Sequence, residues 1–300
     1  MHRVDALLEC SLKRAPKPPA LLIWCCASAT KGVKLRFLSR PRFKDDDVPD
    51  ATIDAIYRYP VKGLSAERLD TVSLSPGKTL PFDRTWAIEN GPSGFDREAP
   101  AALPKIKFLM LMKNENLAAL ETKFDDETRE LEILRHGKRV AGGKLDEPLG
   151  RQLIEQFFSA YSADDLRGAP KILSAPEHSF SDCGRDVISI NNLASLRDLE
   201  RVASRSIDPL RFRANVYVDG WLPWQEFNYV GEKLKLGDEV VVKVVEPIVR
   251  CAATNVDPQT GARDMQIPRL LAGAFGHSDF GIYAEVVRGG TLTPGSRITA

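Results

Sequence analysis

Short strand-like segments separated by turn residues constrain the fold of this chain more than any other feature. Hydrophobic and polar residues alternate over 52–59, and further strand-like runs occupy 69–74, 84–88, 106–112 and 131–134. Gly, Pro, Asn or Asp separates each run from the next, and the 300 residues include 20 prolines and 21 glycines. This pattern predicts a mainly β fold with only a few helices.

Two segments carry a helical pattern instead. Leu149, Leu153 and Phe157 recur at four-residue steps and predict a helix over 148–159. A second helix is expected after Asn191 and Asn192, which are good capping residues. Its apolar face would carry Leu193, Leu196, Leu199 and Val202.

The second half of the chain repeats the strand pattern. The stretch Arg167-Gly168-Ala169-Pro170 is a turn-rich boundary, so we expect two consecutive β-rich units at 51–168 and 169–300. Strands of the second unit are expected at 171–174, 186–190, 211–218, 233–236, 239–246 and 283–287.

Charge and composition exclude several classes of protein. Lys and Arg number 42 and Asp and Glu 41, so the net charge is +1, which argues against a nucleic-acid-binding surface. Hydrophobic residues make up 43% and charged residues 28%, which argues against wholesale disorder. No apolar run approaches the roughly 18 to 20 residues of a membrane span. We therefore expect neither a nucleic-acid partner nor a membrane span.

Residues 1–50 differ from the rest of the chain. They combine many basic residues with a Pro-rich stretch and the apolar run 20–29, which resembles a weak signal peptide. The basic region lies unusually late, and no disulfide framework follows, so export is disfavoured. A disordered basic extension, or a translation start near Val48, is the preferred interpretation, and an organelle-targeting segment is a further alternative.

The cysteines indicate a reducing compartment. Five of them are scattered along the chain without a C-x-x-C pair: Cys10, Cys25, Cys26, Cys183 and Cys251. A disulfide-stapled secreted domain would show a dense, even set. We expect a cytoplasmic protein in which a cysteine acts as a thiolate or as a metal ligand.

Cys251 is the first candidate for chemistry. It follows the β-branched run 240–245 and precedes the turn Asp257-Pro258-Gln259-Thr260-Gly261, so it is expected at the rim of a sheet. The neighbouring Arg250 would favour its thiolate electrostatically. A buried structural cysteine is the more common outcome for a lone cysteine beside apolar strand residues.

Basic residues form the second set of candidates. On the predicted strand 211–218, Arg211, Arg213 and Asn215 share one face and offer donors to a phosphate or an anionic heterocycle. A solvated polar face is the commoner alternative for such a strip. Further candidates in turns or at strand edges are Lys62, Arg84, Arg97 and the carboxylate Asp182.

Together these segments resemble one known family. The motifs Y-P-V-K-G, F-D-R-T-W, S-D-C-G, F-R-A-N and R-C-A-A-T-N-V-D-P-Q-T-G occur in the order found in the MOSC-domain molybdenum proteins. This group includes the mitochondrial amidoxime-reducing component and its bacterial relatives. The resemblance covers residues 52–299 and implies a β-barrel N-terminal unit followed by a MOSC domain.

The resemblance also implies roles for individual residues. Cys251 would bind the molybdenum of the pyranopterin cofactor, molybdopterin, and Asp182 would act beside the metal. Residues implied to surround the cofactor are Lys62, Arg84, Arg97, Arg213, Asn215, Arg250 and Thr254. Gly63 stands where the amidoxime-reducing proteins carry a hydroxyl residue, so one hydrogen bond to the cofactor is missing here. No cysteine follows Cys251, so we expect no intrinsic iron–sulfur cluster.

Three functions follow as hypotheses. The first is a molybdenum-cofactor-dependent oxidoreductase that reduces small N-hydroxylated compounds with electrons from a separate ferredoxin-like or flavin protein. The alternative is a module that carries the molybdenum cofactor, related to sulfuration, without turnover. A third, outside the family, is an enzyme in which Cys251 is the nucleophile and His277 the base.

Overall fold

The computed structural model describes residues 51–300, and the predictions for residues 1–50 lie outside this range. Within it, the fold is mainly β, as predicted. No helix in this range is long and apolar enough to cross a membrane.

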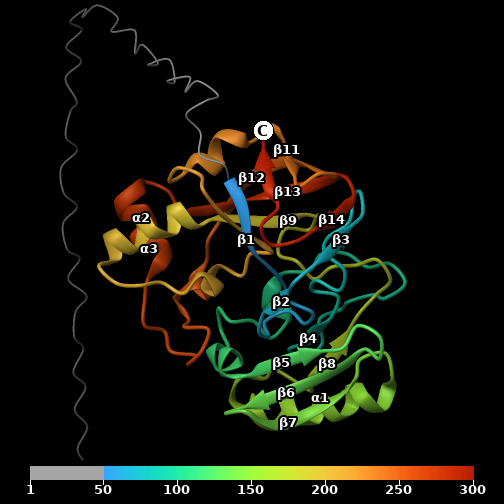
Figure 1. Ribbon diagram of the computed structural model, residues 1–300. Coiled ribbons are helices and arrows are strands. Elements are labelled where there is room, and N and C mark those ends of the chain that lie inside the picture. The colour runs from blue at the N-terminus through green and yellow to red at the C-terminus, as the bar shows by residue number, and fades with distance from the viewer. Residues whose placement is uncertain (1–50) are drawn as a thin grey trace, which may run out of the picture. The chain divides into compact units, whose positions relative to one another are not determined.

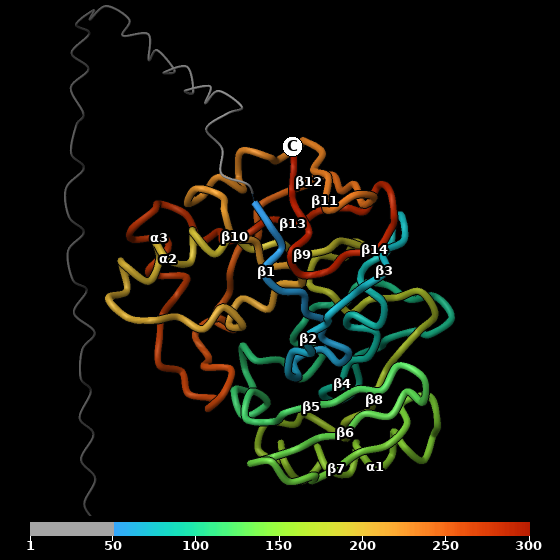
Figure 2. The backbone as a smooth tube through the Cα atoms, viewed as in Figure 1, coloured from blue at the N-terminus to red at the C-terminus, as the bar shows by residue number. Residues whose placement is uncertain are grey.

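Seven strands form a closed barrel (Figures 1 and 2). In spatial order they are β10 (Val216–Asp219), β9 (Ile188–Asn192), β13 (Asp279–Arg288), β12 (Val240–Val249), β11 (Lys233–Leu236), β15 (Arg297–Thr299) and β1 (Ala51–Arg58). Pairing between β1 and β10, which sets Ile53 opposite Val218, closes the barrel. The short strand β2 (Glu67–Leu69) adds to β1 outside the ring. The first described strand is therefore part of a barrel whose other six strands come from the second half of the chain.

The barrel closes around β-branched side chains. Along β12, Val240, Val242 and Val244 are buried and alternate with more exposed residues, as a strand with one buried face requires. Ile53 and Ile56 of β1 join the same hydrophobic core. Burial of each such side chain contributes about 1.5 to 3 kcal/mol.

A second layer is built mainly from the first half of the chain. Strands β5 (Glu121–Phe124), β6 (Glu130–Arg135) and β7 (Lys138–Lys144) form an antiparallel sheet, against which α1 (Pro148–Tyr161) packs. At Gly143 of β7 an added Cβ would lie 2.6 Å from the Cα of Gly150, so this close approach of α1 requires glycine. Two small pairs complete the sheets: β4 (Ala87–Glu89) with β8 (Lys171–Leu173), and β3 (Val72–Leu74) with β14 (Gly290–Leu292).

The other two helices lie side by side next to the barrel (Figure 1). The predicted helix after Asn192 is α2 (Leu193–Ala203), and the Asn192 side chain caps it by accepting a hydrogen bond from the Ala194 amide. The predicted helix at 148–159 is confirmed as α1. The sequence interpretation missed α3 (Ile267–Phe275), although Pro268 in its first turn and Gly276 at its end are ordinary boundary signals.

Two strand predictions are wrong at positions that concern the pocket described below. The 3-10 helix η5 (Pro209–Phe212) and the left-handed residue Arg213 replace the first half of the strand predicted at 211–218. Arg211, Arg213 and Asn215 therefore do not share one strand face. The strand predicted at 106–112 is replaced by the 3-10 helix η2 (Lys105–Lys107) and a following turn. A 3-10 turn thus stands before strand β10 in the first case and at the start of the apolar run 106–112 in the second.

The remaining 3-10 helices are short connections. They are η3 (Glu115–Ala119), η4 (Ala163–Asp165), η6 (Gln225–Tyr229) and η7 (Ala252–Asn255).

Candidate cofactor pocket

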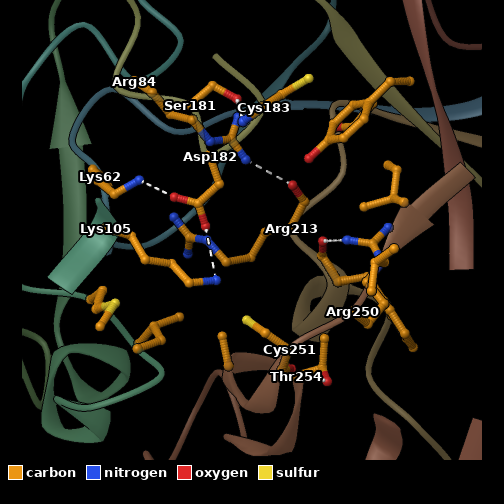
Figure 3. Close-up of a pocket in the computed structure, with 18 of the residues that line it drawn as sticks. Lys62, Arg84, Lys105, Ser181, Asp182, Cys183, Arg213, Arg250, Cys251 and Thr254 are labelled. Carbon is orange, nitrogen blue, oxygen red and sulfur yellow. Dashed lines mark hydrogen bonds and ion pairs between the residues drawn. The ribbon is translucent and has the colours of Figure 1, made fainter. Parts of the chain in front are cut away.

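A cavity of about 460 Å³ collects side chains that are far apart in the sequence. Figure 3 shows basic side chains around its centre and the Cys251 sulfur pointing toward the Lys105 ammonium. All the predicted site residues except Arg97 line the cavity: Lys62, Arg84, Asp182, Arg213, Asn215, Arg250, Cys251 and Thr254. Arg97 is exposed in the loop that follows β4 and does not line it.

Cys251 lies just beyond the end of β12. Its backbone is extended, with φ −112° and ψ 176°, and it caps the 3-10 helix η7. The Thr254 amide and hydroxyl both donate to the Cys251 carbonyl oxygen, at 3.1 and 2.9 Å. Thr254 thus fixes the backbone that carries the thiol, which is free and partly exposed.

The turn after η7 is held by one carboxylate and one buried arginine. Asp257 accepts from the amides of Gln259 and Thr260 at 3.0 and 2.8 Å. The buried Arg211 guanidinium contacts Asp257 and Asp264 at 2.9 and 2.8 Å. Burial opposes ionisation of Asp257, but hydrogen bonds from Thr260 and Gln259 and the charge of Arg211 outweigh it and lower its pKa. The residues Asp-Pro-x-Thr-Gly are therefore a rigid support for the Cys251 segment.

Lys62 and Asp182 form an ion pair on one wall (Figure 3). Lys62 lies in the bend after β1, and its Nζ also donates to the Phe180 carbonyl oxygen at 2.7 Å. Burial lowers the pKa of Lys62, although Asp182 partly opposes this effect. For Asp182, burial favours the neutral form, but the charges of Lys62 and Lys105 prevail and hold its pKa below the ordinary value.

Lys105 is a pocket residue that the sequence interpretation missed. It lies in η2, and its Nζ is 3.5 Å from Asp182 Oδ2. Burial alone would lower the pKa of Lys105, yet the interactions with Asp182 and Cys251 raise it. The segment Lys-Ile-Lys-Phe-Leu-Met-Leu-Met is typical of the start of a strand, so no local pattern indicated that Lys105 would reach a cavity.

Arg84 and Arg213 both lie over the ring of Tyr59. Their guanidinium carbons are 4.6 and 4.2 Å from its centroid. Arg84 pairs with the buried Asp83 and donates to the Arg213 carbonyl oxygen at 2.9 Å. Burial lowers the pKa of Arg213 to about 10, and the charge of Arg84 adds to the effect. Cation–π contacts with Tyr59 therefore hold the two positively charged guanidinium groups in fixed positions.

Arg250 and Asn215 use most of their polar atoms to hold the wall together. Arg250 donates to the carbonyl oxygens of Phe280 and Phe212, each at 2.8 Å, and to Asn191 Oδ1 at 2.9 Å. Its burial lowers its pKa to about 10. Asn215 Oδ1 accepts from the Ser189 amide and hydroxyl at 3.0 and 2.8 Å.

The cysteine–histidine hypothesis lacks the required contact. The His277 ring packs against Trp224 and Phe227, and its Nδ1 accepts from the Asp279 amide at 3.2 Å. His277 does not line the cavity into which Cys251 opens. A nucleophile and its base must be within hydrogen-bond reach, so this hypothesis loses its base.

The chemistry of the cavity fits a metal that arrives with its own organic ligands. Residues 51–300 contain no group of three or more His, Cys, Asp or Glu side chains that would hold a bare metal ion. The cavity offers two soft thiols, Cys183 and Cys251, among several cations, and its volume is in the range of ordinary cofactor sites. Fixed cations suit the phosphate of a large anionic cofactor. The molybdopterin predicted from the resemblance therefore fits these residues.

The described residues thus form a β-barrel joined to a smaller sheet, with free thiols in a cation-lined cavity, an architecture that defines a class of barrel proteins with an internal polar cavity. Two family models match the chain: the MOSC N-terminal beta barrel domain at residues 50–166 and the MOSC domain at residues 175–299. The chain belongs to the MOSC-domain proteins.

Two curated relatives are similar to the chain at low identity. A molybdenum cofactor sulfurase of Drosophila mojavensis is 24% identical over 250 residues, which cover 75% of this chain and 30% of the relative. The chain therefore spans less than a third of that protein. A mitochondrial amidoxime reducing component 2 of Bos taurus is 23% identical over 286 residues, which cover 82% of each chain.

Solved structures match more loosely. The YUAD protein from Bacillus subtilis is 13% identical with a TM-score of 0.39, over 83% of this chain and 94% of that one. YiiM from Geobacillus stearothermophilus is 18% identical with a TM-score of 0.30, over 37% and 52%.

Proposed function

We propose that this protein is a molybdenum-cofactor-dependent oxidoreductase that reduces N-hydroxylated compounds. MOSC domains are associated with molybdenum cofactor binding. The observation that carries the proposal is the free, partly exposed thiol of Cys251 in a cavity walled by cations. The likeness to an amidoxime reducing component along 82% of the chain supports the type of reaction.

The residues that line the cavity would each have a role in this reaction. Cys251 provides the protein ligand to the metal, and Arg84 and Arg213 provide positive charge for the anionic cofactor. When bound, the cofactor supplies the two-electron chemistry that removes oxygen from nitrogen. Asp182, held ionised by Lys62 and Lys105, accepts a hydrogen bond or a proton from the reacting group.

We assign the supply of electrons to a separate ferredoxin-like or flavin protein and the substrate to small N-hydroxylated molecules. The free thiols of Cys183 and Cys251 support a reducing, cytoplasmic setting.

Molybdenum content and reduction of a model amidoxime test the proposal together. The full chain is produced in a host that makes the molybdenum cofactor, and molybdenum per chain is measured beside benzamidoxime reduction with an artificial electron donor. Cys251→Ala is expected to lose both. Cys183→Ala, at the other free cysteine that lines the cavity, is the matched control and should keep both. Full molybdenum in Cys251→Ala would overturn the ligand assignment.

A cofactor carrier without turnover is the second candidate. The likeness to a molybdenum cofactor sulfurase favours it, since that relative matches 75% of this chain. A protein that holds molybdenum but reduces no N-hydroxylated compound with any donor would support the carrier. If the wild type contains neither molybdenum nor pterin, both candidates fail.

A further inference from the structure

The basic side chains of the cavity differ in how many hydrogen bonds and ion pairs they make with other residues of the protein. Lys62 donates to Phe180 and Asp182, and Arg250 donates to Phe280, Phe212 and Asn191. Arg84 pairs with Asp83 and donates to the Arg213 carbonyl, and Arg213 donates to the Leu64 carbonyl. These four cations are therefore anchored to the wall.

Lys105 is held more loosely than these four. Its side chain is 34% exposed, against 10% for Lys62 and 16% for Arg84. Its ion pair with Asp182 is long, at 3.5 Å, and among residues 51–300 no backbone carbonyl accepts a hydrogen bond from its Nζ. Lysine also carries its charge on a flexible stem, so the ammonium can turn toward a ligand at little cost.

Lys105 also lies at the side of the cavity where the Cys251 thiol is (Figure 3). Figure 3 shows its ammonium between Asp182 and the Cys251 sulfur. Asp182 and Cys251 are also the two groups whose interactions raise its pKa. A ligand bound beside the Cys251 thiol would therefore lie next to the Lys105 ammonium (Figure 3).

We infer that Lys105 is a substrate-binding residue that donates a hydrogen bond to the oxygen carried by the substrate nitrogen. The inference rests on the proposed function, and it adds a residue that neither the motifs nor the predicted site contain. Lys105 would discriminate for compounds that bear this oxygen and against their counterparts without it, because a charge-assisted hydrogen bond exists only with the former.

Binding of two matched probes tests this role. Benzohydroxamic acid carries an oxygen on its nitrogen, and benzamide lacks it. The dissociation constant of each is measured by calorimetry on the purified full chain without an electron donor, and molybdenum is assayed in the same samples. The variants are Lys105→Met, which removes the charge, and Lys105→Arg, which keeps it. Lys107→Met is the matched control, because Lys107 lies in the same turn but does not line the cavity.

The expected result is a selective loss. Lys105→Met should weaken benzohydroxamic acid binding about tenfold or more and leave benzamide binding within about twofold. Lys105→Arg should recover part of the loss, and Lys107→Met should behave as the wild type.

Two outcomes would overturn the inference. Equal weakening of both probes, or none, would show that Lys105 does not contact the oxygen. Loss of molybdenum in Lys105→Met would show that Lys105 anchors the cofactor instead. A wild type without molybdenum contradicts the proposed function, whereas the selective loss on that same protein would still support the contact by Lys105.

Discussion

Lys62 and Asp182 form an ion pair across 120 positions of the sequence, and the pair joins the bend after β1 to the turn before β9. Only one partner is buried: the Lys62 side chain is 10% exposed and that of Asp182 46%. Removal of the carboxylate therefore leaves a buried ammonium with the Phe180 carbonyl as its remaining partner.

Asp182→Asn is expected to lower the free energy of unfolding by about 1 to 3 kcal/mol at pH 7. The pKa of Asp182 is lower in the folded protein than its ordinary value. The ionised carboxylate therefore stabilises the folded protein fully at a pH above the ordinary value, and this stabilisation is lost as the pH falls through the lowered pKa. Urea unfolding at neutral and at acidic pH should therefore show the gap between variant and wild type closing in acid.

Glu177→Gln serves as the control for this ion pair. Glu177 pairs with Lys78 at 3.1 Å, but its side chain is 80% exposed. Removal of such a pair should change stability by less than about 1 kcal/mol. An equal loss in both variants would contradict the importance given to burial of Lys62.

Arg211→Met should destabilise the support of Cys251. The Arg211 side chain is 2% exposed and contacts both Asp257 and Asp264, so its loss leaves two carboxylates without their buried partner. We expect a loss of about 3 to 5 kcal/mol, measured by urea unfolding, together with a lower molybdenum content.

Arg205→Met is the matched control, because Arg205 also contacts Asp264, at 2.7 Å, but its side chain is 49% exposed. Its effect should stay below about 1 kcal/mol. If Arg211→Met proves as mild as Arg205→Met, the Asp257 turn does not depend on the buried guanidinium.

Gly281→Ala should disturb the wall that holds Arg250. Gly281 has φ +75°, and a Cβ there would lie 2.6 Å from the Ile190 carbonyl oxygen and would also overlap Asn191 Oδ1. That oxygen accepts a hydrogen bond from Arg250. The strained backbone and the displaced acceptor together should cost about 2 kcal/mol or more in thermal or urea unfolding.

Gly273→Ala provides the opposite case. Gly273 lies within α3, and an added Cβ would meet nothing within 4 Å. Because alanine is the better helix former, this variant should gain about 0.5 to 1 kcal/mol. A loss at Gly273 or no loss at Gly281 would be inconsistent with this account.

Glu226 makes the stability of the protein depend on pH near neutrality. It is fully buried beside α2, where Asn192 and Ser195 donate to its carboxylate at 2.8 Å. Burial raises the pKa of Glu226 from 4.5 to about 7, although the hydrogen bonds oppose the shift. The unfolded chain releases this proton at lower pH than the folded protein does, so stability falls as the pH rises from 4.5 to about 7 and then levels off.

Glu226→Gln should remove this fall. The free energy of unfolding of the variant relative to that of the wild type should increase by about 3 kcal/mol across the same pH range. Urea unfolding at several pH values measures it, with Glu232→Gln at an exposed position as the control. Parallel pH profiles for Glu226→Gln and wild type would refute the assignment.

Local patterns predicted much of the fold. The periodicity of 148–159 and the capping residue Asn192 gave two helices at the right places, and the β-branched run that ends before Cys251 gave β12. These elements depend on neighbours in the sequence, which a single sequence displays.

The sequence predicted which residues line the cavity better than it predicted how their side chains are arranged. The motifs nominated residues that do line it, but Arg211 and Asn215 proved to be supports rather than donors on a shared strand face. The 3-10 helix η5 and the left-handed backbone of Arg213 determine where the side chains of Arg211 and Asn215 point. The alternation of polar and apolar residues in the sequence indicates neither of these backbone features. Lys105 had no motif, because only the tertiary packing of η2 brings it to Asp182 and Cys251.

The closure of the barrel by β1 has a consequence for biosynthesis. Ile53 pairs with Val218 and Ala51 with Ile298, so the barrel partners of β1 are made much later than β1 itself, β10 in the second half of the chain and β15 as the last described strand. Until then only the short strand β2 can pair with β1, so the other edge and the apolar face of β1 stay uncovered, the state in which a nascent chain is most exposed to aggregation and to chaperones. Long-range pairing of this kind also slows folding. The bend that carries Lys62 follows β1 directly, so the pocket is completed in the same late step as the barrel.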